Sequence, residues 1–295
     1  MKHVCAIIVT YEPDFGVLGR LIDAIAPQVD SLVVVDNGSQ LKYQLHQKLG
    51  ASINNKNNVG LASAQNQGIN WAKHHKASHV LIFDQDSEPE ANMVKTLCDA
   101  EVWLLDHGHK VAAVGPVSID RASGVANPFY ALKYGRYQKK YDPDFEYYVD
   151  ALFLIASGQL IRIQILDVVG SMKEELFIDY VDVEWGLRAS ATGYKSYGVT
   201  CARMFHSVGD KSMVIGQARL PMHSPTRNYY MTRNALILYF SFKYPLGWVV
   251  ADSLVMVRRM LVATMLYRPR RENLKNILTG IIHGLFGKSG PKLGG

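Results

Sequence analysis

With 295 residues, 48% hydrophobic and 20% charged, the chain has the composition of a globular protein of one large domain or two modest ones. Its three cysteines lie far apart in the sequence, which argues against a disulfide framework and a cysteine-ligated metal. The net charge of +6 comes from the tail, because residues 243–295 hold nine Lys or Arg and only two Asp or Glu; this tail is also rich in apolar residues, which disfavours nucleic acid as a partner.

Apolar runs rich in β-branched residues alternate with helical patterns over the first 117 residues. The pattern predicts strands at 4–11, 31–39, 51–56, 79–86 and 111–117, and helices at 15–29, 43–50, 60–75 and 91–108. Because strands that alternate with helices form a parallel sheet with helices on its faces, we expect an α/β fold with a mostly parallel, Rossmann-like central sheet.

The second half of the chain has a different pattern. Residues 124–148 are rich in tyrosine and charge, and we expect irregular structure there. The later elements that we expect are a strand and a helix within 148–170, a helix with an acidic first turn at 175–194, and a strand and turn at 196–209. From about Tyr229 onward the pattern is helical, with Pro245 as a break, and it predicts basic amphipathic helices at the C-terminus.

Polar residues follow three of the predicted strands, at the sheet edge where folds of this class bind ligands. They are Thr10 and Tyr11, then Asp36 and Asn37, then Asp84, Gln85 and Asp86. Carboxylate oxygens suit Mg²⁺ or Mn²⁺, above all an ion that also holds phosphate, so Asp84 and Asp86 are candidate metal ligands. The alternative for this short pattern is a solvated strand end that precedes a helix.

The stretch at residues 57–69 is a candidate ligand-contacting segment. Asn58, Gly60 and the small residues after them permit a close approach of the backbone to a phosphate or a ribose. A tightly packed helix start is the alternative. Asp36 can accept hydrogen bonds from a base or a ribose, or it can cap Gly38 and Ser39 within a turn.

Acidic residues near the start of the predicted helix at 175–194 are candidates for a general base. Arg188 lies four residues after Glu184 and is well placed to pair with it. Asp179 and Asp182 are three residues apart and share a face if the segment is helical. Either could take a proton from a hydroxyl, and the alternative is a pair of acids favoured by the helix N-terminus.

Three basic side chains complete the set of candidates. His206 is a metal ligand only if the fold brings it to the metal, and is otherwise a partly buried residue. Arg227 and Arg233 lie six residues apart with tyrosines between them. Arginine suits phosphate oxygens, and the alternative is a helix surface with ordinary salt bridges.

Seven segments occur in an order and spacing that resemble one enzyme family. They are AIIVTYEPD, VVVDNGS, NNVGLASAQNQGI, FDQDS, ASGQLIR, FIDYVDVEWGLRA and RNYYMTRN. Over residues 3–240 the chain resembles inverting family 2 glycosyltransferases of the GT-A fold, and among them bacterial rhamnosyltransferases that use dTDP-activated L-rhamnose. The resemblance implies a GT-A catalytic domain at 1–240, with a nucleotide-sugar half at 1–115 and an acceptor half at 116–240, followed by the helices of 241–295.

The resemblance assigns three groups of residues to the donor. The nucleotide would be surrounded by Thr10, Tyr11, Glu12, Asp36, Asn37 and Ser39. The donor would be lined by Asn58, Gly60, Asn66 and Gln85. The diphosphate, or a loop that closes over it, would meet Arg227 and Arg233.

The resemblance also assigns the metal. Asp84 and Asp86 correspond to the family's Asp-x-Asp motif, which holds a divalent cation, here Mg²⁺ or Mn²⁺, on the diphosphate. His206 lies where some members supply a third metal ligand. The implied reaction is metal-dependent.

The catalytic base implied by the resemblance is Asp182. The family often has Glu-Asp at this position, whereas this chain has Val181 before Asp182, so Asp179 stays a possible substitute. The acceptor would lie near Ser157 and Gly158.

The implied reaction is inverting transfer of L-rhamnose from dTDP-L-rhamnose to a hydroxyl of a cell-surface polysaccharide precursor of the O-antigen or capsule type, with a lipid-linked glycan as acceptor. Another nucleotide sugar, such as a UDP-hexose, is an alternative donor. A non-catalytic nucleotide-sugar-binding protein is a second alternative. A nucleotidyltransferase is disfavoured, because residues 9–16 are not the glycine-rich basic loop with which such enzymes typically open.

The sequence has no signal-peptide pattern and no run of about 18 uncharged apolar residues, so we expect a cytoplasmic protein. Its basic tail is expected to contact the inner face of the bacterial plasma membrane peripherally. The alternative is that the tail packs against the catalytic domain or against a second subunit in a homodimer.

Overall fold

The computed structural model describes residues 2–41, 50–121, 123–133, 136–140, 147–206, 211–215, 218–241 and 243–292. The helix predicted at 43–50 lies outside the described residues, apart from its last residue. The chain forms two compact units: unit 1 holds Met1–Ala131, Gln138–Glu174 and Asp182–Ser207, and unit 2 holds Leu132–Tyr137, Glu175–Val181 and Val208–Gly295. The short segment Glu175–Val181 therefore belongs with the C-terminal helices, although it lies in the middle of the chain.

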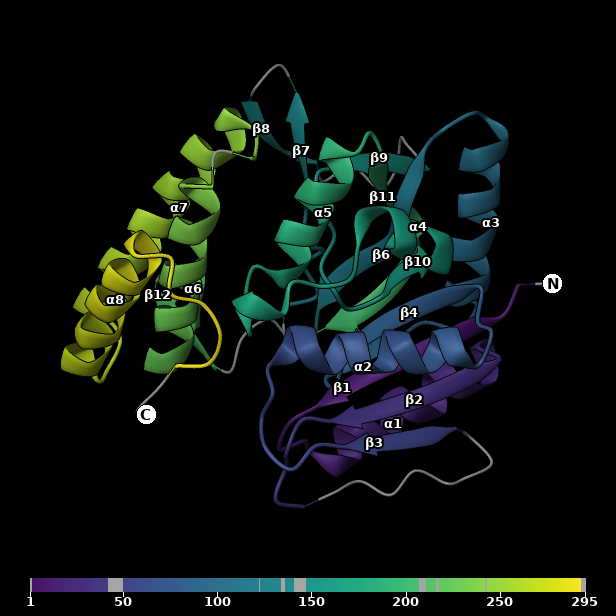
Figure 1. Ribbon diagram of the computed structural model, residues 1–295, viewed down its shortest axis with the longest axis horizontal. Coiled ribbons are helices and arrows are strands. Elements are labelled where there is room, and N and C mark those ends of the chain that lie inside the picture. Colours follow the sequence, from purple (N-terminus) through teal and green to yellow (C-terminus); the bar gives the residue numbers. More distant parts are fainter. Residues whose placement is uncertain are drawn as a thin grey trace. The chain divides into compact units, whose positions relative to one another are not determined.

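Unit 1 is built on one large sheet with the strand order β3-β2-β1-β4-β10-β6-β11-β5, and with β9 beside β11 (Figure 1). Its strands are β1 (Val4–Thr10), β2 (Ser31–Asp36), β3 (Ala51–Asn54), β4 (His79–Asp84), β5 (Ser87–Pro89), β6 (Val111–Asp120), β9 (Tyr148–Ala151), β10 (Gln159–Arg162) and β11 (Lys195–His206). The pairs β1–β2, β1–β4, β2–β3 and β6–β11 are parallel, whereas β5, β9 and β10 are antiparallel to their neighbours. The expected mostly parallel sheet is confirmed, and β1, β2 and β4 end at the same edge.

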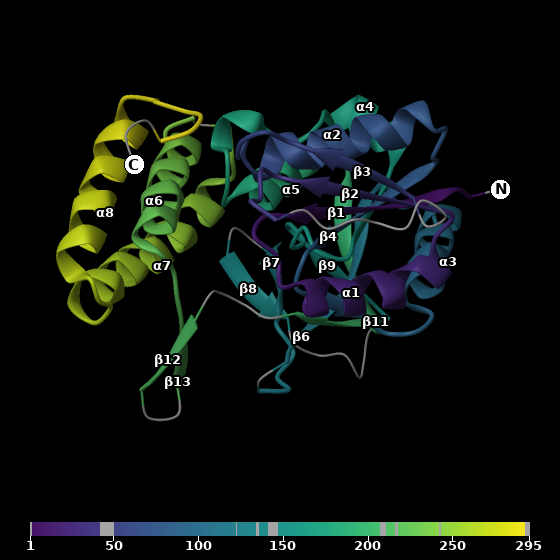
Figure 2. The same cartoon turned by 90° about the horizontal axis from the view of Figure 1, so that it is seen from below.

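Helices cover both faces of this sheet. They are α1 (Phe15–Ile25), α2 (Leu61–His74), α3 (Met93–Asp106), α4 (Ile163–Val169) and α5 (Val181–Ala191), with a 3₁₀ turn at Ala26–Gln28. Figure 2 shows α1 and α3 on one face and α2, α4 and α5 on the other. Alternate strand residues serve the two faces: Ile8 packs in a buried cluster with Leu21 and Leu97, whereas a Cβ added to Gly68 of α2 would lie 2.3 Å from Ile7. Apolar residues are needed on both faces, which explains the continuous apolar runs in the sequence.

Two expectations about the second half of the chain are wrong. Within 124–148, which we expected to be irregular, β7 (Phe129–Lys133) pairs with β8 (Arg136–Lys140). The helix expected at 175–194 begins only at Val181, after a 3₁₀ turn at Glu174–Leu176. Between them Phe177, Asp179 and Tyr180 have left-handed backbones with φ of 66°, 63° and 63°. Because this segment breaks the helix, Asp179 does not share a helical face with Asp182.

Unit 2 consists mainly of three packed helices, α6 (Pro225–Tyr239), α7 (Leu246–Met265) and α8 (Arg270–Leu285), with the hairpin β12 (Lys211–Ile215) and β13 (Ala218–Met222). Pro245 separates α6 from α7, as expected. Glycines let α8 approach α6 closely: a Cβ added to Gly280 would lie 2.7 Å from the carbonyl oxygen of Tyr229, and one added to Gly284 would lie 2.8 Å from that of Arg233. No helix in the described part of the chain is long and apolar enough to span a bilayer.

Candidate functional site

The ends of β1 and β2 are joined by a hydrogen-bond network centred on the buried Asp36. One carboxylate oxygen accepts the N–H groups of Gly38 at 3.1 Å and Ser39 at 2.9 Å, and the other accepts the Thr10 hydroxyl at 3.3 Å. The Ser39 hydroxyl in turn accepts the N–H of Glu12 at 2.8 Å. The capping role considered for Asp36 is therefore present, and this one carboxylate shapes both strand-end loops.

Two asparagines fix the loop before α2 to the end of β2. Asn37 Nδ2 donates to Asn58 Oδ1 at 3.1 Å, and Asn37 Oδ1 accepts the N–H of Val59 at 2.9 Å. Asn58 Oδ1 also accepts the N–H of Gly60 at 2.9 Å. Gly60 has a φ of 91°, a conformation that favours glycine. These side chains hold the loop close to the sheet edge, so a ligand there would meet main-chain atoms of the loop.

Gln85 ties the end of β4 to the end of β1. Its Oε1 accepts the N–H of Tyr11 at 2.8 Å, and its Nε2 donates to the Tyr11 carbonyl oxygen at 3.2 Å. The Tyr11 residue is 49% exposed. Gln85 thus fixes the main chain of Tyr11, whereas the Tyr11 side chain stays accessible. An accessible aromatic ring can stack on a nucleobase.

The turn between β4 and β5 carries Asp84 and Asp86, and the buried hydroxyl groups of Ser87 and Ser157 lie beside it. Ser157 Oγ accepts the N–H of Asp84 at 3.2 Å and hydrogen-bonds to Ser87 Oγ. His206 reaches this turn because β11 pairs with β5, and its Nδ1 lies 3.0 Å from Ser87 Oγ and 3.4 Å from Asp86 Oδ1. Ser157 is fully buried, so its hydroxyl supports the turn from inside the protein.

The donors at this turn fit a divalent cation that is shared with a phosphate. Among the described residues, no group of three or more His, Cys, Asp and Glu side chains is placed to hold a metal by itself. Mg²⁺, however, is commonly held by one or two carboxylates, with substrate phosphates and water as the remaining ligands. The Asp86 side chain is 40% exposed, and His206 lies beside it. This arrangement therefore suits a cation that arrives with its phosphate.

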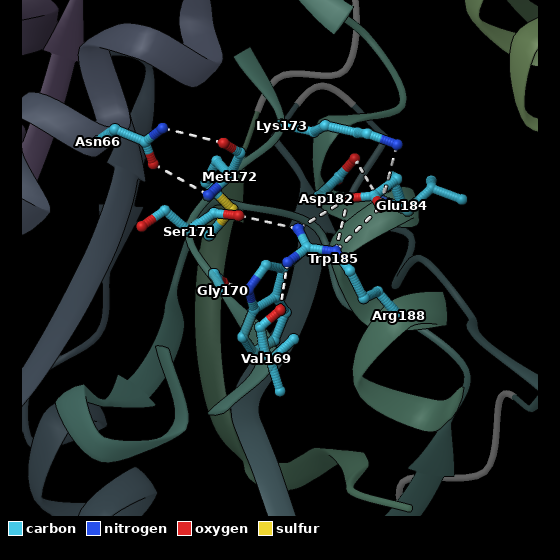
Figure 3. Close-up of polar contacts among 11 residues, drawn as sticks. Asn66, Val169, Gly170, Ser171, Met172, Lys173, Asp182, Glu184, Trp185 and Arg188 are labelled. Carbon is cyan, nitrogen blue, oxygen red and sulfur yellow. Dashed lines mark hydrogen bonds and ion pairs between the residues drawn. The ribbon is translucent and has the colours of Figure 1, made fainter. Parts of the chain in front are cut away.

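Asp182 lies in the first turn of α5, whose Arg188 and Trp185 hold the loop at 169–171 (Figure 3). Arg188 pairs with Glu184 at 2.9 Å, as the sequence predicts, and donates to two carbonyl oxygens of the loop. Trp185 Nε1 donates to a third at 2.9 Å. Asp182 Oδ1 accepts the N–H of the next residue at 2.9 Å. The loop before the 3₁₀ turn is therefore anchored to the helix that carries Asp182.

Asn66 holds the next part of this loop from the side of α2 (Figure 3). Its Nδ2 donates to the Met172 carbonyl oxygen at 2.9 Å and to Glu174 Oε1 at 2.8 Å, and its Oδ1 accepts the Met172 N–H at 2.9 Å. Asn66 is buried and both of its amide protons are engaged. We therefore assign it to positioning residues 172–174, in place of the predicted contact with a donor.

The two predicted arginines are engaged within unit 2. Arg227 Nη2 lies 2.7 Å from Asp179 Oδ1, and its Nε donates to Asp179 Oδ2 at 3.4 Å. Arg233 is fully buried and donates to the carbonyl oxygens of Gly290 at 2.5 Å and Leu176 at 3.0 Å. Arg233 therefore cannot reach a diphosphate in this conformation, and the Asp179 carboxylate is paired with Arg227.

The sequence did not single out Asn234, whose amide holds the left-handed segment before α5. Its Nδ2 lies 2.9 Å from the Leu176 carbonyl oxygen, 2.8 Å from that of Ile178 and 2.9 Å from that of Asp179. Asn234 is fully buried. Asn234 lies within the segment RNYYMTRN quoted above. No pattern in the neighbouring sequence indicates its role, because the carbonyl groups that it contacts lie 55 to 58 residues earlier in the chain.

Asp252 forms a second contact to this segment. Its Oδ2 accepts the hydroxyls of Tyr180 at 2.6 Å and Tyr239 at 2.5 Å. Burial, followed by the negative charge of Asp252, raises the pKa of both tyrosine hydroxyls, which keeps them protonated as donors. Asp252 appeared in the sequence only as one of two acids in a basic tail.

Comparison with known protein families decides between the functions that this geometry permits. Residues 5–170, more than half of the chain, match the family described as Glycosyl transferase family 2. This chain belongs to glycosyltransferase family 2. As a member of that family it is an inverting glycosyltransferase that takes its sugar from a nucleotide-sugar donor.

A curated relative supports the same assignment over nearly the whole length of the glycosyltransferase. The chain is 32% identical over 296 residues to the dTDP-rhamnosyl transferase RfbF of Shigella flexneri. The alignment covers 98% of this chain and 97% of the relative. The similarity therefore includes the helices of unit 2 as well as the part that the family description covers.

Solved structures support the GT-A fold of this family 2 glycosyltransferase. GalNAc-T7, solved with UDP, GalNAc and Mn²⁺, matches with a TM-score of 0.58 and 15% identity, over 80% of this chain and 48% of that chain. Residues 1–349 of TarS from S. aureus match with a TM-score of 0.55 and 17% identity, over 96% of this chain and 81% of that one. The same fragment in complex with UDP-GlcNAc matches with a TM-score of 0.55. At these identities the structures establish the fold alone.

Proposed function

We propose that this glycosyltransferase transfers L-rhamnose from dTDP-L-rhamnose, with inversion, to a hydroxyl group of a glycan. The observation that carries the proposal is the 32% identity over 98% of the chain to a dTDP-rhamnosyl transferase. A UDP-hexose donor is the alternative, favoured by the likeness of the fold to a protein solved in complex with UDP-GlcNAc. That likeness has only 13% identity, and it therefore carries less weight than the full-length relative.

The nucleotide in this proposal binds at the edge where β1, β2 and β4 end. The exposed ring of Tyr11 stacks on the base. Main-chain groups of the loops at 12, 37–39 and 58–60 contact the ribose and the phosphates. Six predicted residues act by holding these loops in shape through the hydrogen bonds described above, namely Thr10, Asp36, Asn37, Ser39, Asn58 and Gln85.

We assign a divalent cation, Mg²⁺ or Mn²⁺, to Asp84 and Asp86, with His206 beside them and with phosphate oxygens and water as its remaining ligands. When bound, such an ion neutralises the charge that develops on the departing diphosphate. His206 Nδ1 lies 3.0 Å from Ser87 Oγ and 3.4 Å from Asp86 Oδ1, so His206 holds the turn in this conformation and would be a third ligand beside the two carboxylates. Arg227 is assigned to holding Asp179.

The base in this proposal is Asp182. A general base needs a carboxylate within hydrogen-bond reach of the attacking hydroxyl. Asp182 is half-buried in the first turn of α5, whereas both oxygens of Asp179 face a guanidinium. Asp182 takes the proton, and the acceptor oxygen attacks the anomeric carbon from the face opposite the nucleotide. The product therefore has inverted configuration.

The acceptor in this proposal is a lipid-linked glycan, a precursor of O-antigen or capsule type, at the inner face of the plasma membrane. A lipid-linked acceptor is confined to a bilayer surface, so an enzyme that acts on it gains from lying there. The basic helices of unit 2 support this part of the proposal.

A donor screen tests the proposal. Purified enzyme is incubated with dTDP-L-rhamnose, UDP-glucose or UDP-GlcNAc, each with Mg²⁺, Mn²⁺ or a chelator, and release of the nucleoside diphosphate is measured. We expect turnover of dTDP-L-rhamnose at least about tenfold faster than of either UDP-sugar, because pocket groups left unpaired by the wrong donor cost more than a factor of ten. Preference for a UDP-hexose would overturn the donor and leave the family intact. Binding of donors without any turnover, even with glycan extracts added, would instead indicate a non-catalytic protein.

A further inference from the structure

One side of α7 presents an unbroken line of apolar side chains to solvent. The exposed residues follow one another at intervals of four, four, three, four and four, which places them on a single stripe of the helix. They are Leu246, Val250, Leu254, Val257, Leu261 and Met265. Trp248, Met256 and Ala263 of the same helix are buried, and Trp248 packs against the rings of Tyr239 and Tyr244. The stripe is therefore additional to the side that α7 uses for packing.

The next helix has a similar stripe. Its exposed apolar residues are Leu274, Leu278, Ile282 and Leu285, followed by Phe286, which is 78% exposed. The opposite side is buried, and its Gly280 and Gly284 lie against α6. Scattered exposed apolar residues are normal in soluble proteins, but two continuous stripes on adjacent helices mark an interaction surface.

The charges beside these stripes are almost all positive. The exposed basic residues of the region are Arg258, Arg259, Arg268, Arg270, Arg271, Lys275 and Lys288. Between residues 246 and 288 the sequence has two acids, and one of them, Asp252, accepts hydrogen bonds from Tyr180 and Tyr239 inside unit 2. Only Glu272 is exposed. An anionic partner therefore meets little repulsion.

We infer that the two stripes and the basic residues beside them, together called the basic–apolar face, dock on the surface of a bilayer that contains anionic lipid. Helices with an apolar stripe and flanking Lys and Arg lie in the headgroup region with the apolar side chains buried in the acyl boundary. A second copy of the chain is the less favourable occupant, because a two-fold interface apposes the same patch on both subunits and would bring these arginines together. The inference rests on the proposed function in one respect only: a glycosyltransferase docked in this way lies on the same bilayer surface as a lipid-linked acceptor. Docking itself does not depend on which sugar is transferred.

The test is sedimentation of the full-length protein with vesicles, in the absence of any sugar donor. We expect binding to phosphatidylcholine vesicles that contain phosphatidylglycerol, much weaker binding to pure phosphatidylcholine, and loss of binding at high salt. Leu254→Ser/Leu261→Ser is expected to lower the partition coefficient by about tenfold or more, because two buried leucines are removed from the contact. Arg270→Gln/Arg271→Gln is expected to lower the preference for anionic vesicles by about tenfold or more.

A matched control is Val102→Ser/Val168→Ser, which removes two exposed apolar side chains from α3 and α4 of unit 1 and should leave binding unchanged. All variants alter exposed residues, so their circular dichroism and donor turnover should match the wild type. Wild-type protein that ignores anionic vesicles, or stripe and control variants that bind equally, would overturn the inference. So would a wild-type dimer in solution that the stripe variant makes monomeric. Vesicle binding without dTDP-L-rhamnose turnover would leave the docking intact and remove only the proposed donor.

Discussion

Asp182 and Asp179 are two carboxylates of the same type, three residues apart, with different surroundings. Asp179 has a left-handed backbone and faces Arg227 with both oxygens, whereas Asp182 lies in the first turn of a regular helix. The two strand-end aspartates differ in the same way. Asp36 is buried and its carboxylate caps a turn, whereas the side chain of Asp86 is partly exposed. The contacts of each carboxylate, more than its type, indicate which one does chemistry.

Asp182→Asn is predicted to keep donor binding and to lose transfer. The asparagine oxygen can still accept the N–H of Val183, so α5 should begin as before. Removal of a general base commonly costs about 10²- to 10⁴-fold in rate. The measurement is the rate of glycan transfer together with the dissociation constant of the donor. In the comparison variant Asp179→Asn we expect a smaller loss of rate, and full activity of Asp182→Asn would move the base to Asp179.

The segment between the 3₁₀ turn at Glu174–Leu176 and α5 has an unusual backbone. Three of its residues have left-handed backbones although none is glycine, and each such residue costs about 1–3 kcal/mol unless the surroundings hold it. The surroundings here are the Asn234 amide on α6 and the Asp252 carboxylate on α7. The C-terminal helices thus hold the backbone that immediately precedes Asp182.

Asn234→Ala is predicted to loosen this segment. Three carbonyl oxygens lose a buried donor, and we expect the free energy of unfolding to fall by about 1–3 kcal/mol. We also expect slower transfer with little change in donor affinity, because the segment leads to the proposed base and not to the strand-end loops. The control is Asn228→Ala on the same helix, whose amide donates to Asn273. A less stable Asn234→Ala enzyme with undiminished transfer would show that the segment has no catalytic role.

The sequence predicts the strand-end cluster well and the segment before α5 poorly, for physical reasons. Continuous apolar runs predict the buried strands. Because the carboxyl ends of parallel strands lie at the same edge of a sheet, Thr10, Asp36 and Asp84 are expected to lie at one edge. Left-handed backbones at non-glycine residues leave no such pattern. The contacts that hold them join residues 48 to 72 positions apart, as in the pairs of Asp179 with Arg227 and of Tyr180 with Asp252.

At the scale of the whole molecule, unit 2 has two roles in this account. Inside, its helices hold the segment that leads to Asp182; outside, α7 and α8 present the basic–apolar face. Composition alone indicates a basic, apolar tail, but only the structure separates the buried Trp248 and Met256 from the exposed stripe around Leu254. The alignment with a dTDP-rhamnosyl transferase, which is 32% identical over 98% of this chain, also includes the helices of unit 2.

The most direct test of the central claim is dTDP-L-rhamnose turnover by the wild-type enzyme and by Asp84→Asn/Asp86→Asn, with Mg²⁺ or Mn²⁺ and after chelation. We expect that wild-type turnover requires the cation and that the variant, with its two carboxylates replaced, loses at least about a hundredfold in rate even at high metal concentration. Wild-type turnover that is unaffected by chelation, or a double variant as fast as the wild type, would contradict the assignment of a metal-assisted rhamnosyl transfer to this strand-end site.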